Sequence, residues 1–378
     1  MMIHKKITAA AAALVMAFSA VPLSAAAAGV KPEITEITQV EAISYSYFES
    51  VDEAGAFVRE ELKKHTPELH IRLSRRSGVN DILNEILGAA FAETGQPDEG
   101  EFLRLSIVGY RAGTGKINHD YCLDISFDYN ATIEQDEAAK AKADEILAEL
   151  ALDGKSEYEK IDAVYEYLTT HVVYSEVERD EIYTAYGALV ENDAVCQGFV
   201  QAMYYMLTAS GVSCRAVMGE GNGGDHVWGI AGIDGTYYYL DPTWDSEFQG
   251  KTRWFFLKGI NDFDEFSKPV VHIPGKGEEL NIAFIPDCTV ESFLPDYPIS
   301  EYKYTPSVKF ITGDINNDKC IDIFDLISIK QGLTGRFRDK SAEQAADIDG
   351  SGDVSVNDAV LLQKYIHGTI TDFSAEIN

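Results

Sequence analysis

One short pattern occurs twice near the end of this chain, and the duplication constrains the fold more than any other feature. Residues 314–335 and 347–368 align at an offset of 33 residues. In both copies, side chains bearing oxygen stand at positions 1, 3, 5 and 12 of a loop, as in EF-hand loops that bind a divalent cation, with position 7 acting through its carbonyl. The expected calcium ligands are Asp314, Asn316, Asp318, Cys320, Asp322, Asp325, Asp347, Asp349, Ser351, Asp353, Ser355 and Asp358. A solvated acidic tail would not repeat these ligands, so we expect two Ca²⁺ sites.

Matching apolar residues after each loop predict a helix there, and no helical pattern precedes either loop. Each copy is therefore expected to be a loop followed by a helix, and the pair a small all-α module. Ser351 is a weaker ligand than Asp, which makes the second site the weaker one in this interpretation. Because clustered carboxylates repel one another until a cation neutralises them, we expect folding of the module to depend on calcium.

The first 28 residues have the pattern of a secretory signal. Lys5 and Lys6 precede an apolar run from Ile7 to Val21, and small residues at 26–28 suit cleavage. We therefore expect an exported protein without a membrane-inserted segment. Removing this segment would change the net charge from −31 to −33, since it holds two lysines and no acid. Such a chain repels phosphate backbones and anionic lipid, so nucleic acid and membrane surfaces are not expected partners.

The rest of the chain divides into three further parts by pattern. Residues 29–130 are expected to form an α/β segment, with a helix over 53–64 and strands over 104–109 and 121–129. Residues 131–294 are expected to form the catalytic core. Prolines in 295–312 predict an extended linker to the duplicated module at 313–370. Within the core we expect helices at 136–150, 158–170 and 196–209, then strands at 214–219, 227–233 and 236–240.

Cys196, His226 and Asp241 form the one set of residues in the sequence that indicates a reaction. Cys196 stands at the start of an apolar helix, and the other two lie on the strands that follow. A thiolate nucleophile, an imidazole base and a carboxylate that orients the imidazole are the minimum for acyl transfer. The helix-start amide of Cys196 is expected to donate to the oxyanion. The second donor stays open, with Gln197 as one candidate.

The remaining cysteines and histidines lack such surroundings. The chain has five scattered cysteines, an odd number without zinc spacing, and we expect Cys196 to be the unpaired one. The other histidines are interpreted as structural; they are His65, His70, His119, His171, His272 and His367. No carboxylate pair stands out that would indicate a glycosidase. No cofactor is expected for catalysis.

Three blocks of sequence, taken in order, resemble the transglutaminase-like cysteine superfamily. They are Tyr186-Gly187-Ala188-Leu189 with Val195-Cys196-Gln197-Gly198, His226-Val227-Trp228, and Tyr239-Leu240-Asp241-Pro242-Thr243-Trp244. The resemblance covers roughly residues 140–245 and implies an α+β, papain-like core, with the thiol at a helix N-terminus and the His and Asp on an antiparallel sheet. It implies the roles of nucleophile, base and orienter for the three residues.

The same resemblance leaves the acceptor of the acyl group open. Transglutaminases of the animal type use a tryptophan upstream of the cysteine, whereas the tryptophans here are Trp228, Trp244 and Trp254, all downstream. Tyr174, Tyr183 and Tyr186 are candidates to replace it. We therefore favour hydrolysis of amide or peptide bonds in a protein or peptide substrate over crosslinking of protein glutamine to lysine. A non-catalytic adhesion module on the same fold is the third alternative.

The duplicated loop and helix resemble the dockerin module. The resemblance implies docking to a cohesin domain of a scaffold protein, in a secreted or cell-surface complex such as a cellulosome. Dockerin contacts usually involve loop positions 10 and 11, which are Ile323 and Phe324 in the first copy and Val356 and Asn357 in the second. Because the copies differ at these positions, a symmetric two-way binding mode is not expected.

Overall fold

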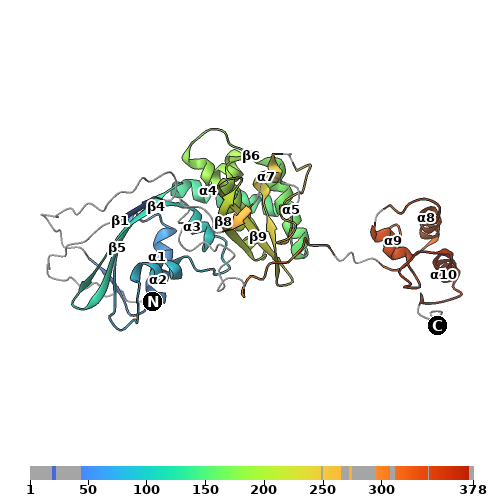
Figure 1. The fold of residues 1–378 in the computed structure, drawn as a ribbon, viewed down its shortest axis with the longest axis horizontal. Coiled ribbons are helices and arrows are strands. Elements are labelled where there is room, and N and C mark those ends of the chain that lie inside the picture. The colour runs from blue at the N-terminus through green and yellow to red at the C-terminus, as the bar shows by residue number, and fades with distance from the viewer. Residues whose placement is uncertain are drawn as a thin grey trace. The chain divides into compact units, whose positions relative to one another are not determined.

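A computed structural model describes residues 19–22, 44–247, 250–264, 272–274, 295–306, 311–338 and 340–373. The chain forms two compact units, Met1–Tyr304 and Thr305–Asn378, and each is considered by itself (Figure 1). The described part of the larger unit contains a five-stranded and a four-stranded sheet with helices packed on them and a small two-stranded sheet, and the regular elements described in the smaller unit are all helices. The mixed α+β class expected from the sequence is therefore confirmed.

The first sheet belongs to the N-terminal part of the larger unit and has the strand order β1-β4-β5-β3-β2. Its elements are β1 (Ser19–Pro22), β2 (Ser46–Phe48), α1 (Val51–Leu62), β3 (Glu68–Leu73), α2 (Ile82–Ala90), β4 (Ile107–Ile117) and β5 (Asp120–Tyr129). All pairings are antiparallel except β2 with β3, which α1 connects. Helices α1 and α2 pack on each other and on this sheet. The helix expected at 53–64 and the strand expected at 121–129 are thus confirmed, with small shifts at their ends.

The strand expected at 104–109 begins only at Ile107. Before it lies a short helix, α3 (Glu101–Leu105), in which all five residues are buried. Gly100 has a positive φ of 54° and starts this helix with a turn that an ordinary side chain would disfavour. The expectation was wrong here because α3 packs on α6 (Cys196–Ala209), a contact between segments far apart in the sequence.

Helices and a second sheet make up the segment expected to be the catalytic core. The main helices are α4 (Ile133–Leu150), α5 (Glu157–His171) and α6, and the sheet has the order β10-β9-β8-β11, antiparallel throughout. Its strands are β8 (Cys214–Gly221), β9 (Gly224–Ile233), β10 (Thr236–Leu240) and β11 (His272–Pro274). The short elements between α5 and α6 are β6 (Val173–Tyr174), η1 (Asp180–Tyr183), η2 (Gly187–Glu191) and β7 (Asp193–Ala194), and α7 (Pro242–Ser246) follows β10.

The sequence explains the positions of these core elements. Thr132 and Ser156 begin α4 and α5 with capping boxes, in which the side chain and the backbone of the first turn satisfy each other. Asp234 and Gly235 both have positive φ, as the tight turn between β9 and β10 requires. Helix α6 is buried over ten consecutive residues, 198–207. A helix that is apolar on every side belongs in the centre of a domain, and α6 packs there on β8 and β9.

The second sheet is covered on both faces. Residues of α5 and α6 belong to the main core cluster together with Ala216, Val227 and Ala231 of the sheet. The aromatic residues Trp228, Tyr239, Phe255 and Phe263 are among those that form a separate cluster. The end of the sheet where His226 and Asp241 lie is therefore enclosed by ordered side chains.

The segment expected to begin a linker at residue 295 is bonded to the core instead. The N–H of Tyr237 donates to the carbonyl of Pro298 at 2.8 Å, and the N–H of Ser300 donates back to Tyr237 at 2.9 Å. Tyr304 donates to Leu257 at 2.8 Å. Residues 298–304 therefore extend the edge of the sheet at β10.

The smaller unit contains α8 (Ile323–Thr334), α9 (Lys340–Ala346) and α10 (Val356–Ile366). Helices α8 and α10 follow the two loops, as expected, and pack on each other. The expectation that no helix precedes either loop was wrong for the second copy, because α9 ends at Ala346, directly before Asp347. Its buried residues are small, Ala342, Ala345 and Ala346, and so gave only a weak apolar pattern.

Most of the predicted signal lies outside the described residues. The exception is β1, which pairs with β4 in register from Ser19 opposite Ala112. Within the described part of the chain, no helix is both long and apolar enough to cross a membrane.

A buried ion pair joins α3, at the base of the first sheet, to the second sheet. The Glu101 carboxylate accepts from Arg215 Nε and from the N–H of Ala216, both at 2.7 Å. The Arg215 guanidinium also lies over the ring of Tyr297, 4.5 Å from its centroid. Removing one partner of a buried pair leaves an uncompensated charge, which costs about 3–5 kcal/mol.

We expect Glu101→Ala to lower the free energy of unfolding of the larger unit by about 3 kcal/mol, because it removes the nearest carboxylate from the buried guanidinium of Arg215 and leaves Glu93, at 3.7 Å, as a more distant one. Urea unfolding monitored by tryptophan fluorescence measures this free energy, since all three tryptophans lie in this unit. The control is Glu68→Ala, which removes a carboxylate that is 63% exposed and should change the same free energy by less than about 0.5 kcal/mol. Equal effects of the two substitutions would contradict this account.

Candidate active site

Cys196 is the first residue of α6, directly after β7. The residue before it, Val195, offers no side-chain cap, so no side chain shields the first amides of the helix. Gly198 allows the helix to start here, because a Cβ on it would lie 2.6 Å from the carbonyl oxygen of Ile182 and 2.8 Å from that of Thr184. The thiol is partly exposed and is not in a disulfide. The site thus has an accessible thiol at a helix N-terminus, where an anion is stabilised.

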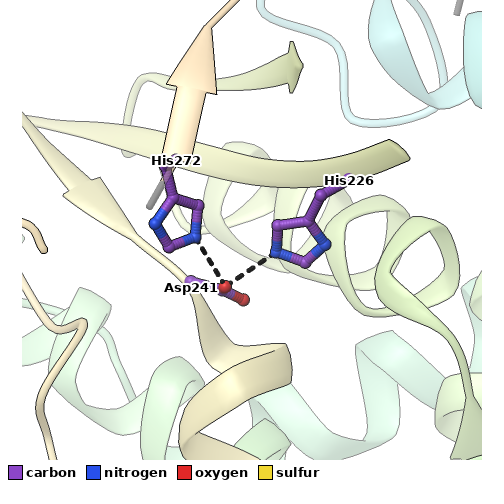
Figure 2. Close-up of side chains that lie close together, drawn as sticks. All are labelled: His226, Asp241 and His272. Carbon is purple, nitrogen blue, oxygen red and sulfur yellow. Dashed lines mark hydrogen bonds and ion pairs between the residues drawn. The ribbon is translucent and has the colours of Figure 1, made fainter. Parts of the chain in front are cut away.

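His226 and Asp241 face each other from neighbouring strands. His226 lies on β9, and Asp241 follows β10 and begins α7. The Nε2 atom of His226 is 2.8 Å from Oδ2 of Asp241 (Figure 2). Both side chains are almost fully buried, with 6% and 0% of their surface exposed. The pair therefore holds the imidazole in one orientation, with Nε2–H donating to the carboxylate.

Several groups hold the Asp241 carboxylate. Its Oδ1 accepts from the N–H of Thr243 at 2.9 Å and from that of Trp244 at 3.3 Å, so Asp241 caps α7. The hydroxyl of Tyr165, on α5, donates to the backbone carbonyl of Asp241 at 2.8 Å. Burial alone would raise the pKa of Asp241, but the charge and hydrogen bond of His226 outweigh it and hold the pKa well below its usual range. Asp241 is therefore ionised.

Cys196 contributes to the electrostatic surroundings of His226. Burial lowers the pKa of His226, but the charge and hydrogen bond of Asp241, with a smaller contribution from Cys196, outweigh burial and raise this pKa to about 10. Since Nε2 faces Asp241, Nδ1 is the ring nitrogen that remains for another partner. The indole of Trp244 stacks on the imidazole, with ring centroids 4.9 Å apart. The structure therefore brings His226 and Asp241 together, and the pairing of the Cys196 thiol with this imidazole stays a prediction.

A second histidine, which the sequence analysis assigned to a structural role, belongs to this group. The Nε2 atom of His272, on β11, is 3.1 Å from the same Oδ2 of Asp241 (Figure 2). Its Nδ1 atom is 2.8 Å from Oδ1 of Asp264. The sequence analysis interpreted His272 as structural and did not place it beside Asp241, where the structure has it. No motif surrounds His272, and only the pairing of β11 with β8 brings it to the site.

The candidates for the oxyanion donors differ in their positions. The side-chain amide of Gln197 donates to the carbonyl of Leu105 at 2.8 Å, so it is engaged away from the thiol. The hydroxyl of Tyr183 donates to Glu178 at 2.8 Å. Tyr174 lies on β6, paired with Ala194, two residues before Cys196. Burial, and then the negative charge of Cys196, raise the pKa of Tyr174. The charge of Cys196 also contributes to raising the pKa of Tyr183, so Tyr174 and Tyr183 both stay candidates, and Tyr183 already has Glu178 as a partner.

The second acidic loop gathers its carboxylates. Oxygens of Asp347, Asp349 and Asp358 lie within 4.8 Å of one another. Asp358 is buried and accepts from the N–H groups of Ile348 at 2.8 Å and Ser355 at 2.7 Å. The Oδ1 atom of Asp347 is buried without a hydrogen-bond partner. An orphaned carboxylate oxygen among oxygen ligands is the arrangement that a hard cation satisfies, so this donor set fits calcium.

The first acidic loop is held by backbone hydrogen bonds of the same kind. Oδ1 of Asp325 accepts from the N–H groups of Ile315 at 2.7 Å and Asn316 at 3.0 Å. Asp314 accepts from the N–H of Asp318 at 3.1 Å. Among the described residues, no three acidic side chains of this loop have carboxylate oxygens within 4.8 Å of one another, unlike the three of the second loop. The lower calcium affinity of the second loop, expected from Ser351, stays a prediction.

One further group could hold a metal ion by geometry. The ligand atoms of His226, Asp241 and His272 lie within 4.8 Å of one another, and all three residues are buried. Each imidazole nitrogen in this group is also at hydrogen-bond distance from Asp241 Oδ2. The same atoms therefore form a hydrogen-bonded row without an ion.

Comparisons with known proteins agree with both parts of this description. A family model of the transglutaminase-like superfamily matches residues 144–242, and one of the dockerin type I domain matches residues 312–367. A multidomain esterase of Ruminococcus flavefaciens is 41% identical over 66 residues, which are 18% of this chain and 9% of that protein. The human kyphoscoliosis peptidase is 22% identical over 151 residues, 36% of this chain and 23% of that protein. The chain thus spans less than a quarter of either relative.

Two solved structures are similar over parts of the chain. One is a complex of the third ScaC cohesin with the ScaB dockerin of Acetivibrio cellulolyticus, 34% identical, covering 18% of this chain and all of that one, with a TM-score of 0.17. The other is a TGase, 15% identical, covering 47% of this chain and 51% of that one, with a TM-score of 0.27. On the two family matches, the chain carries a transglutaminase-like domain followed by a type I dockerin domain.

Proposed function

We propose that this chain is an exported cysteine hydrolase of amide or peptide bonds, attached through its dockerin to a scaffold that carries cohesin domains. The observation that carries the proposal is the buried hydrogen bond between His226 Nε2 and Asp241, in the same domain that places Cys196 at the first position of α6. An activated nucleophile, its base and the orienter of that base are the parts that acyl transfer requires. The transglutaminase-like match covers all three residues.

The chemistry follows from the positions of the groups. The Cys196 thiolate attacks the substrate carbonyl carbon, and the negative charge moves to the carbonyl oxygen, near the first amides of α6 and the Tyr174 hydroxyl. His226 then gives its proton to the departing amine as the carbon–nitrogen bond breaks, which leaves a thioester on Cys196. Water attacks the thioester while His226 takes up one of its protons. The carbon–sulfur bond breaks, and the carboxylic acid product leaves.

Hydrolysis and crosslinking share the thioester and differ only in what attacks it. Two of the three tryptophans, Trp228 and Trp244, pack on the imidazole of His226, and all three follow Cys196 in the chain. This arrangement differs from the upstream tryptophan of animal transglutaminases, and one relative is named a peptidase. Both points support water as the acceptor.

The dockerin supports attachment outside the cell. Its match is of type I, and a similar dockerin of known structure was solved in complex with a cohesin. Ile323, Phe324 and Val356 are exposed at the positions expected to contact a partner, by 51%, 61% and 68%. We propose that these apolar side chains meet a cohesin, in line with an export signal at residues 1–28, and that calcium in both loops holds the two helices in place.

We expect Cys196→Ala to reduce hydrolysis of a labelled protein such as fluorescein-casein to background, because no other described thiol lies at a helix start beside an imidazole. Release of labelled peptides measures the change, and circular dichroism shows that the fold is kept. The matched control is Cys122→Ala, which removes a buried thiol from β5 and should keep full activity. If casein stays intact and incorporates a labelled amine instead, the activity is crosslinking and not hydrolysis.

The raised pKa of His226 gives a prediction of pH dependence. The wild-type imidazole should keep its proton through neutral pH and lose it only as the pH rises towards about 10. In Asp241→Asn the negative charge that raises the pKa of His226 is absent, whereas burial still lowers this pKa. The imidazole of the variant should therefore lose its proton at a pH at least about two units lower than in the wild type. The rate of Cys196 alkylation by iodoacetamide, read by peptide mass spectrometry against pH, measures this change. Identical pH profiles for wild type and variant would contradict the pairing.

We expect Asp347→Ala to weaken calcium binding by the second loop by about tenfold or more, because it removes a charged ligand and the orphaned oxygen. Titration calorimetry of the full chain with CaCl₂ measures the affinity. Glu343→Ala removes one exposed carboxylate from the neighbouring α9 and should leave the affinity unchanged. If the two variants bind calcium alike, the second loop is not a site.

A further inference from the structure

We propose that His272, oriented by Asp264, is a positioning residue of this active site. Its hydrogen bond fixes the orientation of the Asp241 carboxylate, and that carboxylate in turn orients the imidazole of His226. The proposal rests on the hydrolase proposed above and extends its row of interacting groups from three to five. In order, the row is Cys196, His226, Asp241, His272 and Asp264. Asp241 Oδ2 is the central atom, since both imidazoles meet it through Nε2 (Figure 2).

The hydrogen bonds of His272 connect it to a carboxylate on each side. Nδ1 is 2.8 Å from Asp264 Oδ1, and Nε2 is 3.1 Å from Asp241 Oδ2. The backbone N–H of His272 donates to the other oxygen of Asp264 at 2.9 Å. Asp264 therefore holds both the backbone and the ring of His272 in the orientation in which Nε2 meets Asp241.

Aromatic rings surround the His272 imidazole and fix its orientation. Its side chain is 1% exposed. The ring centroid of Trp244 is 4.0 Å away, and that of Phe263 is 4.2 Å away and stacked. Trp244 also stacks on His226, so one indole contacts both imidazoles.

The backbone brings the two histidines together through one strand, β8. Gly219 of β8 pairs with His226 of β9 on one side and with Pro274 of β11 on the other. A Cβ at position 219 would collide with the backbone carbonyl of Ile273. The absence of a side chain there lets β11 approach closely, and His272 is carried to Asp241 with it.

Few other titratable groups face this row. On α5, the Tyr165 hydroxyl donates both to the Asp241 carbonyl and to Asp245 Oδ2, the latter at 2.6 Å. Asp245 of α7 interacts with Asp241 as a like charge. On the side of Cys196 are Tyr174 and, through it, Glu247 and Glu178. Because Asp241 faces a second carboxylate, the hydrogen bond from His272 on its other side helps to stabilise its ionised form.

The same atoms suggest one alternative, a metal ion held by His226, Asp241 and His272. The nitrogen–oxygen distances of 2.8 and 3.1 Å already satisfy each nitrogen with a carboxylate oxygen. An ion bound there would take the Nε2 lone pair of His226 and separate that imidazole from Asp241. The hydrogen-bonded row is therefore favoured, and metal binding is an outcome of the test.

The test compares His272→Leu, His272→Gln and Asp264→Asn in the full chain. Loss of an outer partner that orients a functional group typically costs ten- to a hundredfold. We expect His272→Leu to lower kcat for fluorescein-casein by about that factor, with KM little changed. Gln can keep one N–H on Asp241, so His272→Gln should recover to within about fivefold of wild type. Asp264→Asn, at a side chain that is 26% exposed, should lower kcat severalfold without unfolding the chain.

Alkylation of Cys196 by iodoacetamide against pH serves as a readout that needs no substrate. We expect its profile to change in His272→Leu and to be largely restored in His272→Gln. His70→Leu is the matched control, because His70 forms a similar pair with Asp124 at 2.7 Å in the first sheet; its kcat and profile should be those of wild type. If wild-type Cys196 is alkylated rapidly but casein is not cut, the hydrolase proposal fails, and the alkylation profiles alone decide the role of His272.

Three results would overturn the positioning role. The first is a wild-type kcat and pH profile in folded His272→Leu or, if this variant does not fold, in both His272→Gln and Asp264→Asn. The second is an equal loss of melting temperature in the Leu and Gln variants without any change in kcat per folded site. The third is one Zn²⁺ per wild-type chain after incubation with the metal, lost in His272→Leu and required for activity. Absence of bound zinc in wild type supports the hydrogen-bonded row.

Discussion

The active site depends on one buried carboxylate, that of Asp241. Its two oxygens accept from two imidazoles and from two backbone amides of α7, while Tyr165 fixes its backbone carbonyl. A buried charge is tolerable only when such partners surround it. Strand β10, the start of α7 and the Tyr165 hydroxyl meet at Asp241. Their positions have one purpose in common, which is to stabilise this buried charge. Any change that leaves the carboxylate unpaired would disturb all of them together.

The parts of the site predictable from the sequence were those with local signals. The helix at 196–209 was predicted because an apolar run follows a turn and ends before Gly211, and the strands bearing His226 and Asp241 were predicted from β-rich runs around Asp234-Gly235. These signals lie within a few residues of the elements that they describe. The mixed fold class could be predicted for the same reason.

The parts that were missed depend on contacts between distant segments. His272 reaches Asp241 because β11 lies against β8, and nothing beside residue 272 in the chain indicates that pairing. Helix α3 is likewise stabilised by its packing on α6, and Glu101 meets Arg215, 114 residues later. In α9 the buried residues are alanines, which give little contrast between the two faces of a helix. In each case the deciding energy is tertiary, and local propensity is only a weak guide to it.

The burial of α6 has a consequence for how a substrate could reach the thiol. With ten consecutive residues packed on all sides, this helix cannot shift without disrupting the close-packed interior. Cys196, the proposed nucleophile, is therefore a fixed point. In the proposed hydrolase, adaptation to differently shaped substrates would fall to exposed residues before this helix, such as Val173, Tyr174 and Val177, which are exposed by 66%, 45% and 66%. Rigidity at the reacting atom and freedom at the entrance are thus assigned to separate stretches of the chain.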